Sequence, residues 1–193
     1  GYRSQVKHKL KGDIKFEGLM LPANQDISAR ITTPANLTIG AYHDINDKWS
    51  VMAEFGRTYW SSFDTLDIYG ENNGKMSTTE ERWKDTTFYA IGASYQYNDQ
   101  WKFRVGFAVD QSAVGQEYRT PRIPDSDRLW YSSGIEYKYN DDWTFNLGYT
   151  YIRADKGKVK LLGYHDGDNA RGSLQADYEN DIHILGFGAS YNF

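Results

Sequence analysis

The sequence predicts an all-β chain, and within that class a transmembrane antiparallel β-barrel. The last segment, residues 181–193, alternates between an apolar set and a set of small or polar residues. Because successive side chains of a strand point to opposite faces, one face of this segment suits lipid and the other suits water or a confined space. Two further observations agree: a tight-turn motif occurs three times, and no apolar run is long enough for a helix to cross a bilayer. The apolar set comprises Leu185, Phe187, Ala189, Tyr191 and Phe193.

The composition supports strands and excludes several classes of protein. The chain has 193 residues, no cysteine, 16% aromatic residues and a net charge of -4. Tyr, Thr, Phe, Trp and Val dominate the ordered-looking stretches, which is typical of strands. The charge gives no reason to expect nucleic-acid binding, and the absence of cysteine excludes a disulfide framework. No export signal opens the sequence, so we expect that it was removed or that these residues belong to a longer protein.

We expect eight strands, joined by alternating short and long connections. Several exceed the roughly 9 to 11 residues that cross a bilayer, so their outer ends should project beyond it. The first carries Arg3, Gln5, Lys7, Lys9 and Lys11 on one face, and a polar stretch, residues 18–29, follows it. The expected strands are residues 2–17, 31–45, 49–70, 82–97, 101–112, 127–139, 143–161 and 174–193.

The repeated turn motif places three hairpins at one end of the barrel. Asn and Asp favour tight turns because their side chains mimic backbone hydrogen bonds and tolerate left-handed geometry. The opposite connections, near residues 70–81, 111–127 and 162–174, are long and polar. Short periplasmic turns and long extracellular loops are typical of bacterial outer-membrane barrels, with tryptophans at the inner interface. The motif reads Asn46-Asp47-Lys48-Trp49, Asn98-Asp99-Gln100-Trp101 and Asn140-Asp141-Asp142-Trp143.

The two faces of the strands differ sharply. In residues 101–110 the outward set is aromatic or aliphatic, whereas the inward set includes Lys102, Arg104 and Gly106. A glycine in a strand eases bending, and this alone explains any single one. As a ring, however, the glycines would underfill a narrow eight-stranded barrel, so they favour a wider one. The inward glycines are Gly40, Gly56, Gly92, Gly106, Gly134, Gly148, Gly186 and Gly188.

Several stretches resemble the FadL-type long-chain fatty-acid transporters. The resemblance runs over essentially the whole chain and is most specific at Pro124-Asp125-Ser126-Asp127-Arg128. It implies the last eight strands of a fourteen-stranded barrel, without the amino-terminal hatch and the first strands of that family. Residues 1–193 would then be a single β-barrel domain or part of one. The matching stretches are residues 2–8, 59–63, 83–95, 101–106 and 123–130.

The resemblance also implies a function and a place in the cell. It implies passive uptake of long-chain fatty acids or other hydrophobic molecules across the outer membrane of a Gram-negative bacterium. Ligand would enter from outside, pass a lumenal site and leave sideways through a gap in the wall. Implied partners are membrane lipid, lipopolysaccharide, and the barrel-assembly machinery, which would engage the carboxy-terminal strand ending at Phe193. No nucleic-acid partner is expected.

Four residues are candidates for ligand binding in the lumen. A carboxylate ligand needs a cation in an otherwise apolar pocket. Lys84 falls on the inward set with Phe88, and the resemblance places a lumenal basic residue there; the alternative is a solvated lumen lysine. Arg128 and Arg104 also point inward, and Arg104 is expected to form a structural ion pair with Glu136. The candidates are therefore Lys84, Arg128, Phe88 and Arg104.

An enzyme is not expected. The four histidines, at positions 8, 43, 165 and 183, have neither metal-ligand nor catalytic-triad spacing. We therefore expect no catalytic residue, metal or cofactor. The alternative to transport is a small closed eight-stranded outer-membrane barrel with a structural or adhesive role. A wide or open arrangement of strands favours transport, and a tight closed cylinder favours the alternative.

Overall fold

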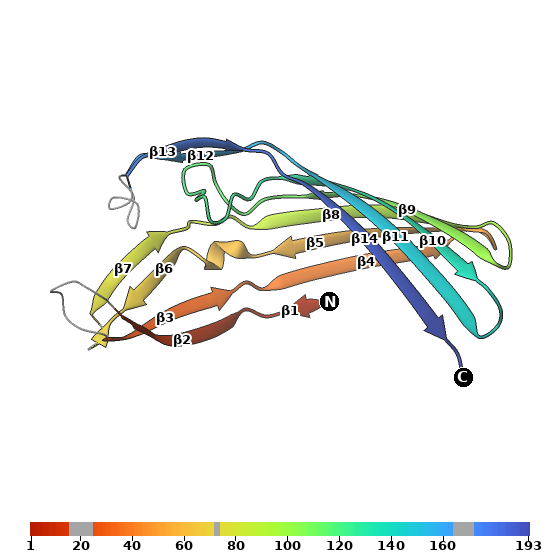
Figure 1. Ribbon diagram of the computed structural model, residues 1–193, viewed down its shortest axis with the longest axis horizontal. Helices are drawn as coiled ribbons and strands as arrows, with labels where there is room; N and C mark the ends of the chain where they lie inside the picture. The colour runs from red at the N-terminus through yellow and green to blue at the C-terminus, as the bar shows by residue number, and fades with distance from the viewer. Residues whose placement is uncertain (16–24, 72–73, 164–171) are drawn as a thin grey trace.

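The computed structural model describes residues 1–15, 25–71, 74–163 and 172–193. Its secondary structure is β, apart from one turn of 3-10 helix at Trp60–Ser62. No helix in these ranges is long and apolar enough to span a membrane. Figure 1 shows an elongated, twisted wall of strands.

Eight antiparallel strands form the main sheet, in the order β1-β4-β5-β8-β9-β10-β11-β14. From β4 onward, each strand of this sheet pairs with the next strand of the sheet along the chain, so the sheet is an antiparallel meander. The outer strands β1 and β14 do not pair with each other within the described residues, so the sheet is an open wall and not a closed cylinder. The strands are β1 (Tyr2–Arg3), β4 (Asn36–Asp44), β5 (Trp49–Thr58), β8 (Thr86–Gln96), β9 (Trp101–Asp110), β10 (Arg128–Lys138), β11 (Trp143–Ala154) and β14 (Asp181–Tyr191).

The wall continues beyond the main sheet at one end. A four-stranded sheet has the order β2-β3-β6-β7, and a separate hairpin pairs β12 with β13. Both lie at the end opposite the three tight turns (Figure 1). The strands therefore continue past the main sheet at this end, which is the end where the sequence analysis expected them to project beyond the bilayer. These elements are β2 (Val6–Ile14), β3 (Gln25–Thr33), β6 (Thr65–Tyr69), β7 (Lys75–Glu80), β12 (Gly157–Leu161) and β13 (Leu174–Tyr178).

Some expected boundaries were wrong. Five of the long strands are interrupted, for instance between β3 and β4 at Pro34, which has no amide hydrogen for a ladder. The expected polar connections 18–29 and 70–81 contain the start of β3 and all of β7. β7 is polar on both faces, so it lacks the alternation that marks a strand in lipid. β3 does alternate, with Ile27, Ala29 and Ile31 on one face, and the sequence analysis began it too late. The expected strand 82–97 begins only at Thr86.

The three tight turns are closed as the sequence predicts. In each, the side-chain oxygen of the motif's asparagine accepts hydrogen bonds from the backbone amides two and three residues later, at 2.7–3.0 Å. Each motif tryptophan then packs on a tyrosine of the adjacent strand. The ring centroids lie 4.6 Å apart in Trp49–Tyr95, 4.4 Å in Trp101–Tyr137 and 4.9 Å in Trp143–Tyr191.

The two faces of the main sheet are as expected. We call the face that carries Phe107, Leu147 and Phe187 the outer face, and these side chains are 37%, 46% and 74% exposed. The opposite, inner face carries Arg104, Asn146 and the glycines. The aromatic row therefore does not form the centre of a packed globule. Buried apolar side chains gather mainly at the extended end of the wall, among them Phe63, Val114, Val159 and Leu161.

Candidate lumenal site

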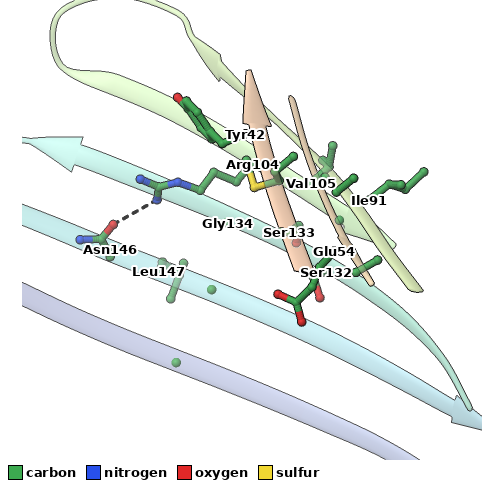
Figure 2. Close-up of a pocket in the computed structure, with 18 of the residues that line it drawn as sticks. Tyr42, Glu54, Ile91, Arg104, Val105, Ser132, Ser133, Gly134, Asn146 and Leu147 are labelled. Atoms are coloured by element: carbon green, nitrogen blue, oxygen red, sulfur yellow. Dashed lines mark hydrogen bonds between the residues drawn. The ribbon is translucent and has the colours of Figure 1, made fainter. Parts of the chain in front are cut away.

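A hollow of about 830 Å³ lies over the glycines of the main sheet (Figure 2). The strand registers bring these glycines together, because Gly92 lies opposite Gly106 and Gly148 lies opposite both Gly134 and Gly186. Seven of the eight predicted glycines line it: Gly40, Gly92, Gly106, Gly134, Gly148, Gly186 and Gly188. The eighth, Gly56, lies beneath Phe88, whose Cβ would be 3.3 Å from a Cβ added there.

Arg104 crosses the hollow's floor and is held at both ends of its guanidinium. It passes over Gly134 of β10, where a Cβ would lie 3.7 Å from that of Arg104, to donate to Asn146 Oδ1 of β11 at 3.3 Å. Its other terminal nitrogen pairs with Glu136, which confirms the predicted ion pair. Lys102 Nζ lies 4.0 Å from the same carboxylate. Arg104 and Lys102 thus share one carboxylate, and the absence of a side chain at Gly134 leaves room for Arg104 to reach Asn146.

Glu54 is the contrasting group on this floor. It comes from β5, is exposed, and has only small residues, Gly40 and Ala90, opposite it in the neighbouring strands. No hydrogen bond or ion pair joins it to another residue in the part of the chain that the structure describes. Figure 2 shows it at the hollow, on a different strand from Arg104. The sequence analysis did not select Glu54, although its position two residues before the inward Gly56 is the signal that could have placed it on this face.

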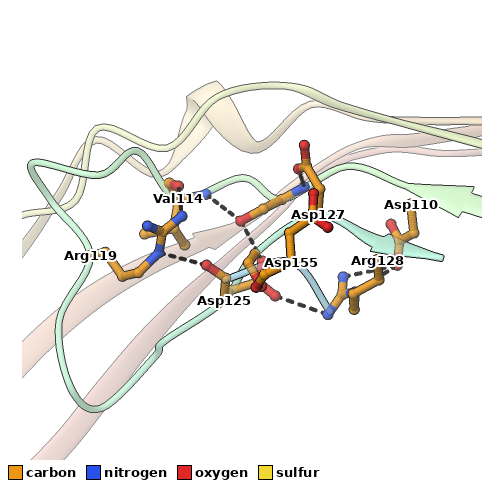
Figure 3. A network of polar contacts seen from close by, with 9 residues as sticks. Asp110, Val114, Arg119, Asp125, Asp127, Arg128 and Asp155 are labelled. Carbon is orange, nitrogen blue, oxygen red and sulfur yellow. Dashed lines mark hydrogen bonds and ion pairs between the residues drawn. The ribbon is translucent and has the colours of Figure 1, made fainter. Parts of the chain in front are cut away.

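Arg128 belongs to a polar network at the outer end of β9 and β10 (Figure 3). Its guanidinium lies 2.9 Å from Asp110 Oδ2 and 2.9 Å from Asp125 Oδ1. Ser112 donates its hydroxyl to Asp125 at 2.8 Å and its backbone amide to Asp127 at 2.7 Å. The Pro-Asp-x-Asp-Arg stretch therefore ties both ends of the 111–127 connection together, and Arg128 is engaged by two carboxylates.

A buried arginine that the sequence analysis missed holds the same connection from inside. Arg119 is 9% exposed and donates to three backbone carbonyls, of Asp125 at 2.6 Å, Lys158 at 2.8 Å and Val114 at 3.2 Å. The Lys158 contact links the connection to β12. One arginine in an irregular segment leaves no periodic signal, so only the fold reveals this role.

The remaining candidates lie above the hollow. Phe88 and Arg128 both lie opposite Asp110 in the sheet, so they share one row, and Phe88 packs edge-on against Trp130 with centroids 6.4 Å apart. Lys84 precedes β8, is exposed, and donates its backbone amide to Ala113 at 2.9 Å. The four predicted residues thus occupy three heights of the wall and do not form one cluster.

The residue after Lys84 anchors a neighbouring turn. Asp85 accepts a hydrogen bond from the Ser61 backbone amide at 3.0 Å and lies 3.5 Å from Arg57. The Ser61 hydrogen bonds, and secondarily the Arg57 charge, hold the pKa of the Asp85 carboxyl below its ordinary value. This contact fixes the 3-10 turn beside Trp83, which packs edge-on against Trp60 at 4.8 Å.

The described residues give little support to a metal-binding site or to a catalytic role for a histidine. Within them, no group of three or more His, Cys, Asp and Glu side chains is placed to hold a metal ion. His183 lies on the outer face, where its Nδ1 is 2.7 Å from the Tyr149 hydroxyl. The geometry is that of a wall with a recessed, glycine-lined inner face.

Comparison with known proteins gives one consistent result. The profile of the family described as outer membrane protein transport protein (OMPP1/FadL/TodX) matches residues 1–193. A long-chain fatty acid transport protein of Escherichia coli O6:H1 is 29% identical over 207 residues, covering all of this chain and 45% of the relative. This chain therefore spans about half the length of that curated relative.

Solved structures show the same architecture. A Pseudomonas aeruginosa FadL homologue superposes with a TM-score of 0.86 at 26% identity, covering 98% of this chain and 47% of the homologue. The Pseudomonas putida toluene transporter TodX has a TM-score of 0.63 at 23% identity, covering all of this chain and 44% of its own, and is similar in fold alone.

Proposed function

Because the chain belongs to the OMPP1/FadL/TodX family of outer-membrane transport proteins, we propose that it forms part of the wall of a passive channel for long-chain fatty acids or other hydrophobic molecules. The family consists of outer-membrane transport proteins of Gram-negative bacteria and not of enzymes. The tight turns would face the periplasm and the extended end the exterior, as in other outer-membrane barrels.

The observation that carries this proposal is the recessed inner face. Seven glycines hollow out about 830 Å³ of space behind a wall whose outer face is aromatic and aliphatic. Side chains fill the interior of narrow barrels. A wall in which glycines replace larger side chains at one height therefore leaves room for a solute to pass. A route through such a space needs little rearrangement of the wall itself.

We also propose which partners contact this wall. Membrane lipid and lipopolysaccharide would contact the outer face, and the barrel-assembly machinery would recognise the end of β14. Phe193 is fully exposed beyond that strand, and Tyr191 packs edge-on against it with centroids 5.0 Å apart. An exposed aromatic side chain directly after a lipid-facing strand is a suitable recognition element. Deleting Phe193 from the full-length protein should slow its appearance in the outer membrane.

Uptake by cells that lack their own transporter tests the channel. A strain would express the full-length protein, and the initial rate of labelled fatty-acid and aromatic-hydrocarbon uptake would be measured. Gly186→Leu should reduce uptake, because a Cβ there meets no atom within 4 Å and the new side chain fills the hollow without disturbing the wall.

A matched control lies three residues along the same strand. Ala189 is exposed on the outer face, so Ala189→Leu adds a similar volume toward lipid. It should leave uptake unchanged at equal outer-membrane abundance. The proposal fails if both variants transport equally well, or if the unmodified protein supports no uptake of either solute class.

A further inference from the structure

Four aromatic rings form a row across the outer face of β9, β10, β11 and β14. Phe107 lies opposite Tyr131, which lies opposite Tyr151 in the next strand. Tyr151 in turn lies opposite His183 of β14, and the centroids of these two rings are 5.0 Å apart. The Phe107–Tyr131 and Tyr131–Tyr151 centroids are 5.4 Å and 6.2 Å apart, so neighbouring rings pack on one another. We call these four residues the outer aromatic row.

A hollow of about 530 Å³ opens beside the outer aromatic row. Ser133 makes room for it, because this small residue lies in the next row of the same face, between Val105 and Tyr149. Tyrosine rings thus surround an exposed serine on the face that membrane lipid would cover. The outward-facing residues around the hollow are Tyr131, Ser133, Tyr149, Tyr151 and His183, and Gly106 and Ser132 complete its lining.

Two hydroxyl groups at the hollow lack a partner in the part of the chain that the structure describes. The hydroxyl of Tyr149 is engaged, because it lies 2.7 Å from His183 Nδ1. The hydroxyls of Tyr131 and Ser133, by contrast, make no hydrogen bond to any described residue. A hydroxyl can both donate and accept, and leaving it unpaired in hydrocarbon costs free energy. The hollow therefore favours an occupant that carries hydrogen-bonding groups of its own.

The hollow lies near the outer boundary of the membrane in the proposed orientation. Tyr151 follows Trp143, at the tight turn of the same strand, by eight residues, and roughly 9 to 11 residues of a tilted strand cross the bilayer. The next outward pair along β11 and β14 is charged, because Arg153 lies opposite Asp181 and both are exposed. Tyr151 donates to Asp181 at 3.1 Å, which joins the outer aromatic row to this charged edge. An occupant of the hollow would therefore belong to the outer leaflet, at the depth where acyl chains meet their headgroup.

The same row has a different character on the other strands of the main sheet. It continues through β8, β5 and β4 as Ile91, Ala53 and Ala41. None of these side chains can form a hydrogen bond, so that part of the wall suits any acyl chain. The combination of a hollow, aromatic rings and unpaired hydroxyls at this height is a local feature and needs its own explanation.

We propose that the hollow binds lipid A, the membrane anchor of lipopolysaccharide. Lipid A carries amide and hydroxyl groups where its acyl chains join the sugar headgroup, and these groups can both donate to and accept from Tyr131 and Ser133. The ester groups of a phospholipid at this depth only accept hydrogen bonds. Tyrosine has an apolar body and a polar tip, which suits the boundary between acyl chains and a sugar headgroup. The inference rests on the proposed orientation and names the lipid that one part of the outer face would hold.

Native mass spectrometry of the full-length protein in neutral detergent, titrated with purified lipid A, tests this site. Tyr131→Phe/Ser133→Ala keeps the hollow but removes both unpaired hydroxyls. It should weaken lipid A binding about tenfold or more, which is the loss expected for two neutral hydrogen bonds. Phosphatidylglycerol, which has no amide and no hydroxylated acyl chain, should bind the variant and the unmodified protein equally weakly. The control Tyr89→Phe should bind lipid A normally, because it removes an exposed hydroxyl of β8 where Tyr89 packs against Phe55, away from the hollow.

A second pair of variants tests the shape of the hollow. Ser133→Leu fills it and should weaken lipid A binding at least as much, whereas Ala189→Leu adds a similar volume elsewhere on the outer face and should not. Unchanged binding by Tyr131→Phe/Ser133→Ala, or phosphatidylglycerol binding as tightly as lipid A, would overturn the inference. So would dimers of the unmodified protein that Ser133→Leu abolishes, because a second copy would then occupy the hollow. Solute uptake by these variants should not change, since the side chains face away from the channel, so failure of the lipid site and failure of the channel give different results.

Discussion

Arg119 should determine whether the long connection between β9 and β10 stays folded. Arg119→Met keeps most of the side-chain volume but removes the charge and every donor, leaving the carbonyls of Asp125, Lys158 and Val114 without this partner. Hydrogen bonds from charged donors are each worth about 1.5–3 kcal/mol. Burying the cation costs several kcal/mol in return, so the net loss should be about 3 kcal/mol.

This loss should be local, because the contacts of Arg119 join residues 111–127 to β12 and do not enter the main sheet. Hydrogen exchange of the full-length protein in detergent measures such local opening. Amides of the connection, including that of Ser112, which donates to Asp127 at 2.7 Å, should exchange about 100-fold faster in the variant. Amides in the middle of β9 and β10 should be unaffected.

Two companion variants make the result specific. Arg122 lies in the same connection but is exposed, so Arg122→Met removes an equal charge without removing a buried contact. Arg119→Lys should give an intermediate effect, because a lysine keeps the charge but lacks the planar fork that spans several carbonyls. The reasoning is refuted if Arg119→Met opens the connection no more than Arg122→Met does.

Two further predictions concern charged groups on either side of the membrane boundary. Glu54→Gln should raise the uptake of a fatty-acid anion roughly two- to fivefold, because it removes a screened repulsion on the inner face. Uptake of an uncharged hydrocarbon should not change, and an equal rise for both solutes would contradict the charge argument. Asp85 has a folded-state pKa below its ordinary value of 3.8, so its contribution to stability is fully present above that value. It should be lost as the pH falls through the lowered pKa, which tryptophan fluorescence from Trp60 and Trp83 would report; in Asp85→Asn this acid transition should be absent.

Period-two alternation made the membrane-spanning strands predictable, and its absence explains the errors elsewhere. In β9 and β11 lipid selects one face and the interior the other, so the pattern of Trp101 to Val109 is enough to orient the strand. Outside the membrane a covered face need not be apolar: in β7 it carries Thr79, which is only 7% exposed, so such a polar strand leaves no such record. The register of β2 against β3, which unites Lys9 with Arg30, also depends on pairing that no local pattern encodes.

The candidate site was predictable to the same extent. Alternation placed Arg104 and Arg128 inward correctly, and the pairing of Arg104 with Glu136 is confirmed. It could not show that the 111–127 connection folds back to bring Asp125 onto Arg128. The sequence analysis also began this strand at residue 82, whereas β8 begins at Thr86, so Lys84 lies in the irregular segment before the strand. The role of Lys84 in binding stays a prediction.

The distribution of charge along the inner wall bears on how such a channel would treat its solutes. The guanidinium of Arg104 is already paired with Glu136 and that of Arg128 with two aspartates, so each is engaged within the wall, although Lys102 shares the carboxylate of Glu136. Between them lies a floor of glycines with Glu54 exposed on it. A fatty-acid anion passing this wall would gain little from its headgroup, and its chain would gain most from the uncluttered surface. This wall therefore acts on solutes mainly through its shape and apolar contacts. Filling the hollow at Gly186 should for this reason reduce the uptake of charged and uncharged solutes alike. Glu54→Gln should instead raise the uptake of the fatty-acid anion and leave that of the uncharged hydrocarbon unchanged.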